Sequence, residues 1–282
     1  MQTALAVEGN LGLRATNALV EEALRFAELG TTTSRHPTMR LRPSESATWP
    51  PSVSRARSTT AGCSARRSRS SSAHPLVVLS RAQLLTMLGR FDEVWPVAQE
   101  ASEQLGQLGQ LDGSDHLAEM ARFAGDHEAA AHYLGLHCED LEERGDHLST
   151  YAPARGRLLC MLGRYDEAEP LAQVGRELGD EKDASTQMVW RQVQALVDAH
   201  RGEHAEAERL AREAVEIGER TDGLNYQGDA FCDLAEVLAE AGKRDEASHT
   251  LEQALERYER KNNLAMVAQV RPRLEELRAR VT

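Results

Sequence analysis

Residues 162–168 read Leu-Gly-Arg-Tyr-Asp-Glu-Ala, and variants of this stretch recur along the chain. Each variant has a glycine after a small, apolar or, once, basic residue, then two polar or aromatic residues, then an acidic and alanine-rich stretch. The glycines are Gly89, Gly125, Gly163, Gly202 and Gly242, which lie 36, 38, 39 and 40 residues apart. A period of this length is typical of a helical solenoid, in which each repeat is a pair of helices.

The glycines are placed to end one helix and let the next begin, because the left-handed backbone at a helix C-terminus costs glycine little. Acidic residues follow closely, where they can cap or electrostatically favour the start of the second helix. These are Asp92, Asp126, Asp166 and Asp245.

Small residues mark the inner faces of the predicted pairs. Seven residues before each glycine stand Ala82, Ala118, Gly156, Ala195 and Ala235. Along the second helices, small or apolar residues recur three apart, as in Ala98 and Ala101, Ala211 and Ala214, and Leu251 and Ala254. Such spacing predicts closely packed antiparallel helices.

Composition supports an all-α class and limits the function. The 282 residues are 41% hydrophobic but only 4% aromatic, and strong helix formers dominate. A formal charge of −12 argues against nucleic acid and anionic membrane as partners of the whole protein. The four cysteines are far apart and form no Cys-x-x-Cys pair, and we find no signal peptide or membrane span. We therefore expect a cytoplasmic protein with reduced thiols.

From about residue 76 to residue 277 the pattern of small residue, glycine, aromatic and later alanines resembles the tetratricopeptide repeat. The copies depart from it at His137 and Gly175, which replace a late alanine, and at Asp198, which takes an apolar position. The resemblance implies that residues 76–282 form a right-handed α-solenoid of five helix pairs plus a capping helix.

A closer resemblance is to the C-terminal repeat region of bacterial signalling proteins. In those proteins an adenylate/guanylate cyclase domain or a transcriptional regulator precedes an AAA-type ATPase. The similar stretches are residues 148–152, 187–191, 219–225 and 258–263. The resemblance implies a tail that senses partners or restrains catalytic domains. No phosphate-binding Gly-x-x-x-x-Gly-Lys-Ser/Thr loop is present, so ATPase or cyclase activity is not carried over.

The N-terminal part of the chain divides in two. Residues 1–30 read as a helical segment left from a preceding repeat. Residues 31–75 are rich in Ser, Thr, Arg and Pro, with eight arginines, no lysine and a single acid. They are either a natural disordered linker or a repeat read out of frame, since a shifted frame in GC-rich coding sequence turns acidic codons into Ser, Thr and Arg. A third reading, a phosphate-binding arm, lacks interleaved aromatics.

Histidines and acidic pairs suggest chemistry only at first sight. His127, His132 and His137 recur every five residues and so point around a helix, while Gly202 separates His200 from His204. Acidic pairs recur once per repeat at helix starts, which fits solubility and capping. We expect no metal, no cofactor and no catalytic residue, so the protein is not predicted to be an enzyme.

The remaining candidate is the concave face, which first helices line in tetratricopeptide proteins. The register predicts that this face binds a peptide. For any one of its residues, the alternative is that the residue is solvated and contacts no ligand. Its residues are Gln83, Thr86, Glu119, Arg122, Arg157, Arg191, Gln192, Asp229 and Glu236. Trp190 beside them is expected to pack between repeats, and Arg191 to form an ion pair or a contact.

Two functions follow from this sequence. The first is a non-catalytic protein-interaction or regulatory module in bacterial signalling or transcriptional regulation, which binds a protein or peptide. The second is a truncated remnant of a larger cyclase or ATPase regulator with no independent function. Loss of upstream repeats would expose an apolar end, so self-association is also expected.

Overall fold

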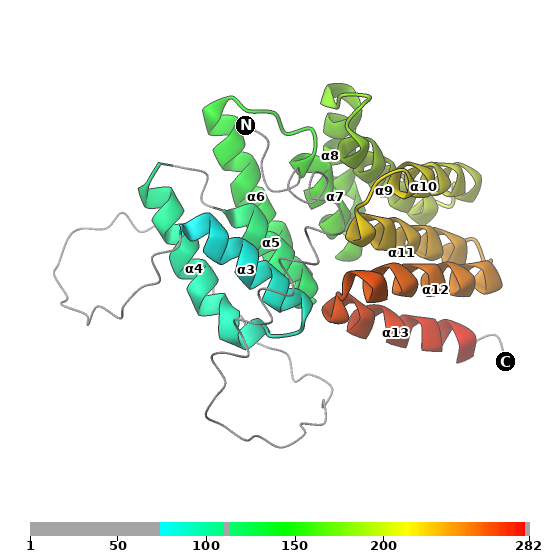
Figure 1. Ribbon diagram of the computed structural model, residues 1–282. Coiled ribbons are helices and arrows are strands. Elements are labelled where there is room, and N and C mark those ends of the chain that lie inside the picture. Colours follow the sequence, from blue (N-terminus) through cyan, green and yellow to red (C-terminus); the bar gives the residue numbers. More distant parts are fainter. Residues whose placement is uncertain (1–73, 110–112, 280–282) are drawn as a thin grey trace, which may run out of the picture.

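The computed structural model describes residues 74–109 and 113–279, and within these ranges all regular secondary structure is α-helical. The segment predicted for residues 1–30, and residues 31–73 of the next segment, lie outside the described residues. Figure 1 shows the helices arranged as successive pairs. The pairs are α3 (Pro75–Met87) with α4 (Phe91–Gln107), α5 (Ser114–Phe123) with α6 (His127–Arg144), α7 (Tyr151–Met161) with α8 (Tyr165–Leu178), α9 (Ala184–His200) with α10 (His204–Glu219), and α11 (Leu224–Glu240) with α12 (Arg244–Lys261). A single helix, α13 (Leu264–Ala279), follows.

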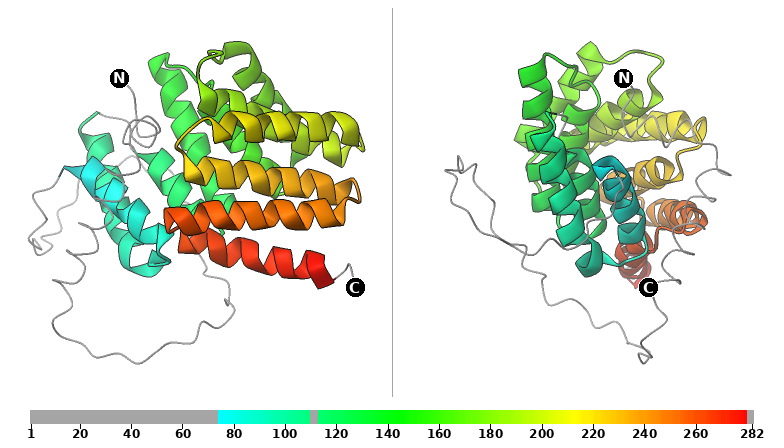
Figure 2. Two further views of the ribbon diagram at one scale, coloured as in Figure 1. Left: turned by 45° about the vertical axis from the view of Figure 1, so that its right-hand side comes forward. Right: turned by 60° about the vertical axis from the view of Figure 1, so that its left-hand side comes forward.

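The helices stack in chain order, which makes the fold an α-solenoid of helix pairs, as predicted. Each helix packs on its partner and each pair on the next, and α9 also contacts α7 and α11. The two turned views show α10 to α13 lying side by side as one layer (Figure 2).

The predicted turn glycines have the predicted backbone. The φ angles of Gly89, Gly125, Gly163, Gly202 and Gly242 are 79°, 81°, 73°, 82° and 78°, in the left-handed region that favours glycine. The acidic residues after them act in two ways. Asp126 caps α6, since its side chain accepts a hydrogen bond from the Ala129 amide at 2.9 Å. Asp92, Asp166 and Asp245 instead lie in the first turns of their helices, where a negative charge is favourable.

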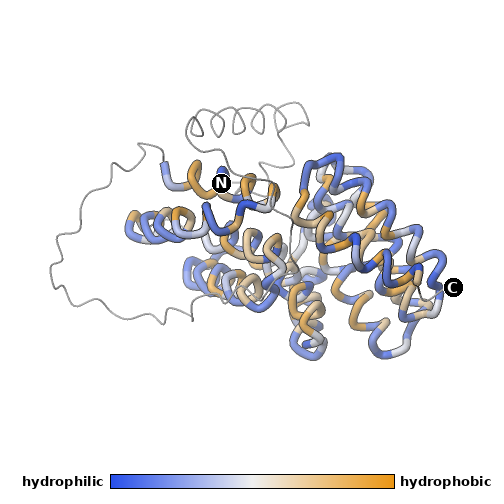
Figure 3. Tube along the Cα trace, turned by 90° about the horizontal axis from the view of Figure 1, so that it is seen from below, coloured by the Kyte–Doolittle hydropathy of each residue, from blue (hydrophilic) through white to orange (hydrophobic). Residues whose placement is uncertain are grey.

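The small residues are buried where the helices cross, as predicted. The four alanines that precede the turn glycines by seven residues are at most 3% exposed. At Gly156 a Cβ would lie 3.1 Å from the Ala168 carbonyl oxygen, so the two helices of that pair approach closely. Gly175 is equally constrained, because a Cβ there would lie 2.8 Å from the Pro153 ring. Apolar and polar stretches accordingly alternate along each helix (Figure 3).

Helix α5 joins two hydrophobic clusters of buried residues. One cluster comes from α3 and α4 and includes Leu117 and Met120 of α5. The other extends from Met87 at the end of α3 to α13 and includes Ala118, Ala121 and Phe123 of α5. Helix α5 therefore contributes buried side chains to both clusters, and Met87 of α3 also belongs to the second.

The last helix returns toward the first pairs. Helix α13 contacts both α12 and α3. Gln269 of α13 donates hydrogen bonds to the backbone carbonyls of Arg122 (3.3 Å) and Phe123 (2.8 Å) in α5. Helix α13 is therefore hydrogen-bonded across the inner face to the second helix pair.

Apolar side chains are exposed on the first pair, at Leu76 and Val77 of α3, Val97 of α4 and Leu108 just after α4. Self-association through this end stays a prediction. Among the helices of residues 74–109 and 113–279, none has the length and apolar character needed to cross a bilayer.

Candidate partner-binding cavity

A cavity of about 140 Å³ lies on the inner face of the solenoid. It is formed mainly by the first helices of the pairs, α3, α5, α7, α9 and α11, with one residue from α6. Six of the nine residues predicted for the concave face line it: Gln83, Glu119, Arg122, Arg157, Gln192 and Asp229.

The other three predicted residues lie elsewhere. Thr86 is buried, and its hydroxyl donates to the Ala82 carbonyl within α3. Arg191 is half-buried and pairs with Glu213 at 3.1 Å. Its guanidinium also lies 4.2 Å from the centre of the Trp190 ring, which packs against the core as predicted. Glu236 forms an ion pair with Arg273 of α13.

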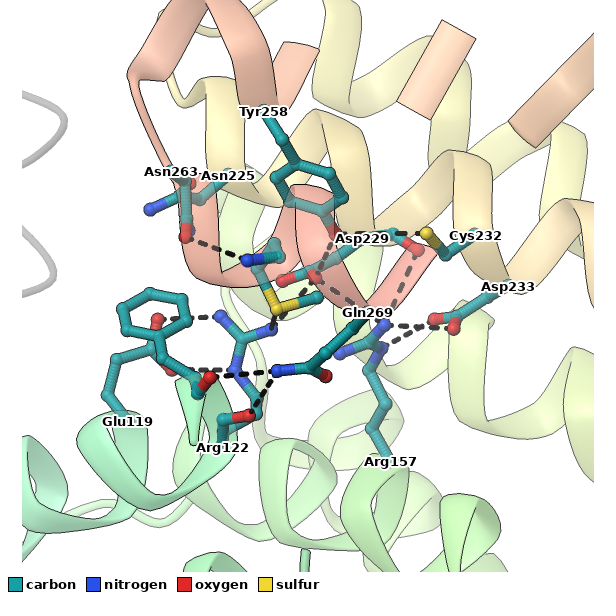
Figure 4. A network of polar contacts seen from close by, with 12 residues as sticks. Glu119, Arg122, Arg157, Asn225, Asp229, Cys232, Asp233, Tyr258, Asn263 and Gln269 are labelled. Carbon is teal, nitrogen blue, oxygen red and sulfur yellow. Dashed lines mark hydrogen bonds and ion pairs between the residues drawn. The ribbon is translucent and has the colours of Figure 1, made fainter. Parts of the chain in front are cut away.

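The charged residues of the cavity are bonded to one another. Arg122 of α5 makes a bidentate pair with Glu119, with N–O distances of 2.8 and 2.7 Å. The same guanidinium donates to Asp229 of α11 at 2.9 Å. Side chains of the second and fifth pairs thus meet across the inner face (Figure 4).

A second arginine makes a similar bridge. Arg157 of α7 forms a bidentate pair with Asp233 of α11, at 2.5 and 2.9 Å. Gln192 of α9 donates to the same carboxylate at 2.8 Å. Tyr258 of α12 donates to Asp229 at 2.7 Å. Five helices, α5, α7, α9, α11 and α12, therefore share one buried polar network.

The network carries more acid than base. Three carboxylates, those of Glu119, Asp229 and Asp233, face the two guanidiniums of Arg122 and Arg157. Burial alone would raise the pKa of Asp229, but the charges of Arg122 and Arg157 hold it below its ordinary value. Burial raises the pKa of Asp233 in spite of Arg157, and the charge of Asp229 adds to the rise. With every group ionised, the network has a formal charge of −1.

The remaining walls are apolar, with one more ion pair. Leu134, Leu158 and Val189 line the cavity beside Tyr151 and Tyr226. At the start of α5, the His116 ring lies 3.0 Å from Asp115, and both residues line the cavity. Burial by itself would lower the pKa of His116, but the hydrogen bond and the charge of Asp115 raise it.

The histidines singled out in the sequence pack rather than converge. His200 stacks on Tyr165 at a ring distance of 4.0 Å, and buried His137 meets the edge of Tyr151 at 4.3 Å. Across residues 74–109 and 113–279, no three metal-ligating side chains gather in one place.

Residues 185–260, which span α9 to α12, match the family model of the tetratricopeptide repeat. These residues are therefore similar to the tetratricopeptide repeat. A crystal structure of a tetratricopeptide repeat protein from Parabacteroides merdae is similar to this chain at 16% sequence identity and a TM-score of 0.45. That similarity covers 72% of this chain and 78% of the other. No curated protein matches the sequence.

Three residues that hold the inner face together were not predicted from the sequence. Asp233 and Tyr258 belong to the buried polar network, and Gln269 bonds α13 to α5. The spacing could have placed Asp233 on the inner face, because it lies four residues after Asp229 and shares its face of the helix. Tyr258 lies in a second helix of the tetratricopeptide region, and Gln269 in the last helix. Tyr258 bonds Asp229 within its own helix pair. The contact of Gln269 with α5 depends on how far the solenoid curves, which repeat register does not specify.

Proposed function

We propose that this protein is a non-catalytic interaction module that binds an extended segment of a partner protein on its inner face. The cavity supports the proposal most directly, since it combines apolar walls with charged and amide groups on five first helices. A mixed lining of this kind suits a peptide whose side chains enter between helices. The tetratricopeptide region at residues 185–260 supports the same kind of function.

The cavity leaves space for one side chain rather than for a whole peptide. Its volume, about 140 Å³, is close to that of an engineered protein cavity of about 150 Å³ that binds benzene. We therefore propose that the partner lies along the rim and inserts a single anchor residue.

Peptide display with the full chain tests this function. Peptides selected on the wild-type protein should bind the Ala154→Trp variant at least about tenfold more weakly, because the indole fills the cavity. Ala154 is half-buried and lines the cavity, whereas Ala205 of α10 is exposed and does not. The Ala205→Trp variant is therefore the matched control.

A second blocking variant, Gln83→Trp, approaches the cavity from α3. It separates blocked binding from misfolding, which far-UV circular dichroism checks for each variant. If no peptide is enriched, or if both blocking variants bind as the wild type does, the proposal is wrong.

We also propose a cellular setting for this interaction module. The four stretches that resemble bacterial signalling tails support a regulatory role beside a cyclase or a transcriptional regulator, in the cytoplasm. Tagged full chain, purified from the cells that produce it, should retain such a protein in a manner that Ala154→Trp abolishes. Retention of unrelated proteins by both forms would contradict the setting.

A further inference from the structure

Gln192 lines the cavity and has one hydrogen-bond acceptor that no donor meets among the described residues. Its Nε2 donates to the Asp233 carboxylate, and the reversed amide would set two oxygens against each other, so the orientation is fixed. The remaining Oε1 is buried and has no hydrogen-bond partner in the part of the chain that the structure describes. Leaving a buried acceptor unpaired is unfavourable, so a ligand that brings a donor gains from meeting it.

The charge of the surroundings selects the kind of donor. Both guanidiniums at the cavity already bind carboxylates, Arg122 to Glu119 and Asp229, and Arg157 to Asp233. An anionic ligand would compete with these bonds and add to the acid excess. A cationic ligand would compensate the excess without displacing either arginine.

The apolar walls select the shape. Leu134, Leu158 and Val189 offer packing for a methylene chain, and Tyr151 and Tyr226 lie beside them. Long basic side chains bury their aliphatic stems in this way while the charged head reaches polar groups. A free phosphate has no such stem, and the carboxylate stems of Asp and Glu are shorter than those of Lys and Arg.

We propose that the cavity binds a lysine or arginine side chain of the partner, with its head group donating to Gln192 Oε1 and its stem against the apolar wall. This inference rests on the proposed function, because it names the anchor residue that the partner inserts.

The first test changes the ligand. Peptides selected on the full chain should share a Lys or Arg. Replacing it by norleucine or citrulline, which keep the stem and remove the charge, should weaken binding roughly tenfold or more by fluorescence anisotropy. Unchanged affinity, or selected peptides that need the cavity but contain no basic residue, would overturn the inference and leave the proposed function standing.

The second test changes the acceptor. Gln192→Leu should weaken binding of the basic peptide by roughly three- to tenfold, the size expected for one hydrogen bond. Gln194→Leu is the matched control: Gln194 lies on the same helix, its Nε2 donates to Asp198 at 2.7 Å, and it does not line the cavity. Equal affinities of the two variants would contradict the role of Gln192.

The third test separates the inference from the function. Free n-butylguanidine and n-butylamine, with n-butyrate as the anionic control, are titrated into the wild type, Gln192→Leu and Ala154→Trp. If no peptide binds but the two cations do, in a way that Ala154→Trp abolishes, the function fails and the chemistry of the cavity stands. If neither peptides nor cations bind, both are wrong.

Discussion

Removal of Arg157 tests how much the buried network contributes to stability. The side chain is 7% exposed and holds Asp233, itself 6% exposed, through two hydrogen bonds. In Arg157→Met the stem still packs, but the carboxylate keeps only Gln192 as a hydrogen-bond partner among those described. Breaking a buried ion pair from one side costs about 3 to 5 kcal/mol, so we expect a loss of about that size in the free energy of unfolding.

An exposed pair provides the control. Arg201 binds Glu169 with the same bidentate geometry, at 2.5 and 2.7 Å, but the two side chains are 41% and 39% exposed. Exposed pairs contribute about 0 to 1 kcal/mol, so Arg201→Met should change stability little. Urea unfolding followed by circular dichroism measures both variants. Equal losses for Arg157→Met and Arg201→Met would refute the reasoning.

Two further results sharpen the test. Replacing both partners, Arg157→Met with Asp233→Leu, should recover much of the loss, because no buried charge remains unpaired. The cost of Arg157→Met should also shrink in acid. Burial already raises the pKa of Asp233 above 3.8, and without Arg157 it rises further, so the folded variant binds a proton more readily than the unfolded chain. The destabilisation should therefore be greatest above that raised pKa and decrease as the pH falls through it.

Three other predictions concern packing, closure and pH. Gly175→Ala should cost about 1 to 3 kcal/mol, since its Cβ would lie 2.8 Å from Pro153, and an unchanged melting temperature would contradict this. Gln269→Leu should speed hydrogen exchange in α13, because two bonds to α5 are lost; unchanged protection would mean that they do not hold the ends together. The stability that His116 contributes should be present below its unfolded pKa, about 6.5, and should be lost as the pH rises through the raised folded value. Wild type and His116→Gln should therefore differ more in urea unfolding at acid than at alkaline pH, and a constant difference would exclude this coupling.

The turns and the inner faces could be predicted from the sequence because local physics determines them. Glycine at positive φ, as at Gly163, marks a helix end whatever surrounds it. Small residues such as Ala195 report a close helix crossing within the same pair. The register counted from these glycines then placed Gln83, Arg157 and Gln192 on the inner face, where the cavity is.

The pairing of Arg122 with Asp229 could not be predicted in this way. The two residues are separated by 107 positions, and they meet only because four stacked pairs curve enough to bring α5 to α11. Curvature is the sum of small rotations between neighbouring pairs, and each depends on packing details that no single repeat encodes. The register therefore predicted a concave face that mixes Arg, Gln and acidic residues, but not which of them pair.

This closure changes what the inner face can bind. An open groove with Arg122 and Arg157 unpaired would attract acidic partners, because guanidiniums bind carboxylates bidentately. In the folded chain both arginines are already engaged by carboxylates of α5 and α11, and one acceptor and one negative charge are left over. Once their partners are included, the two arginines no longer favour an acidic ligand, and the acceptor and charge that are left over favour a basic one.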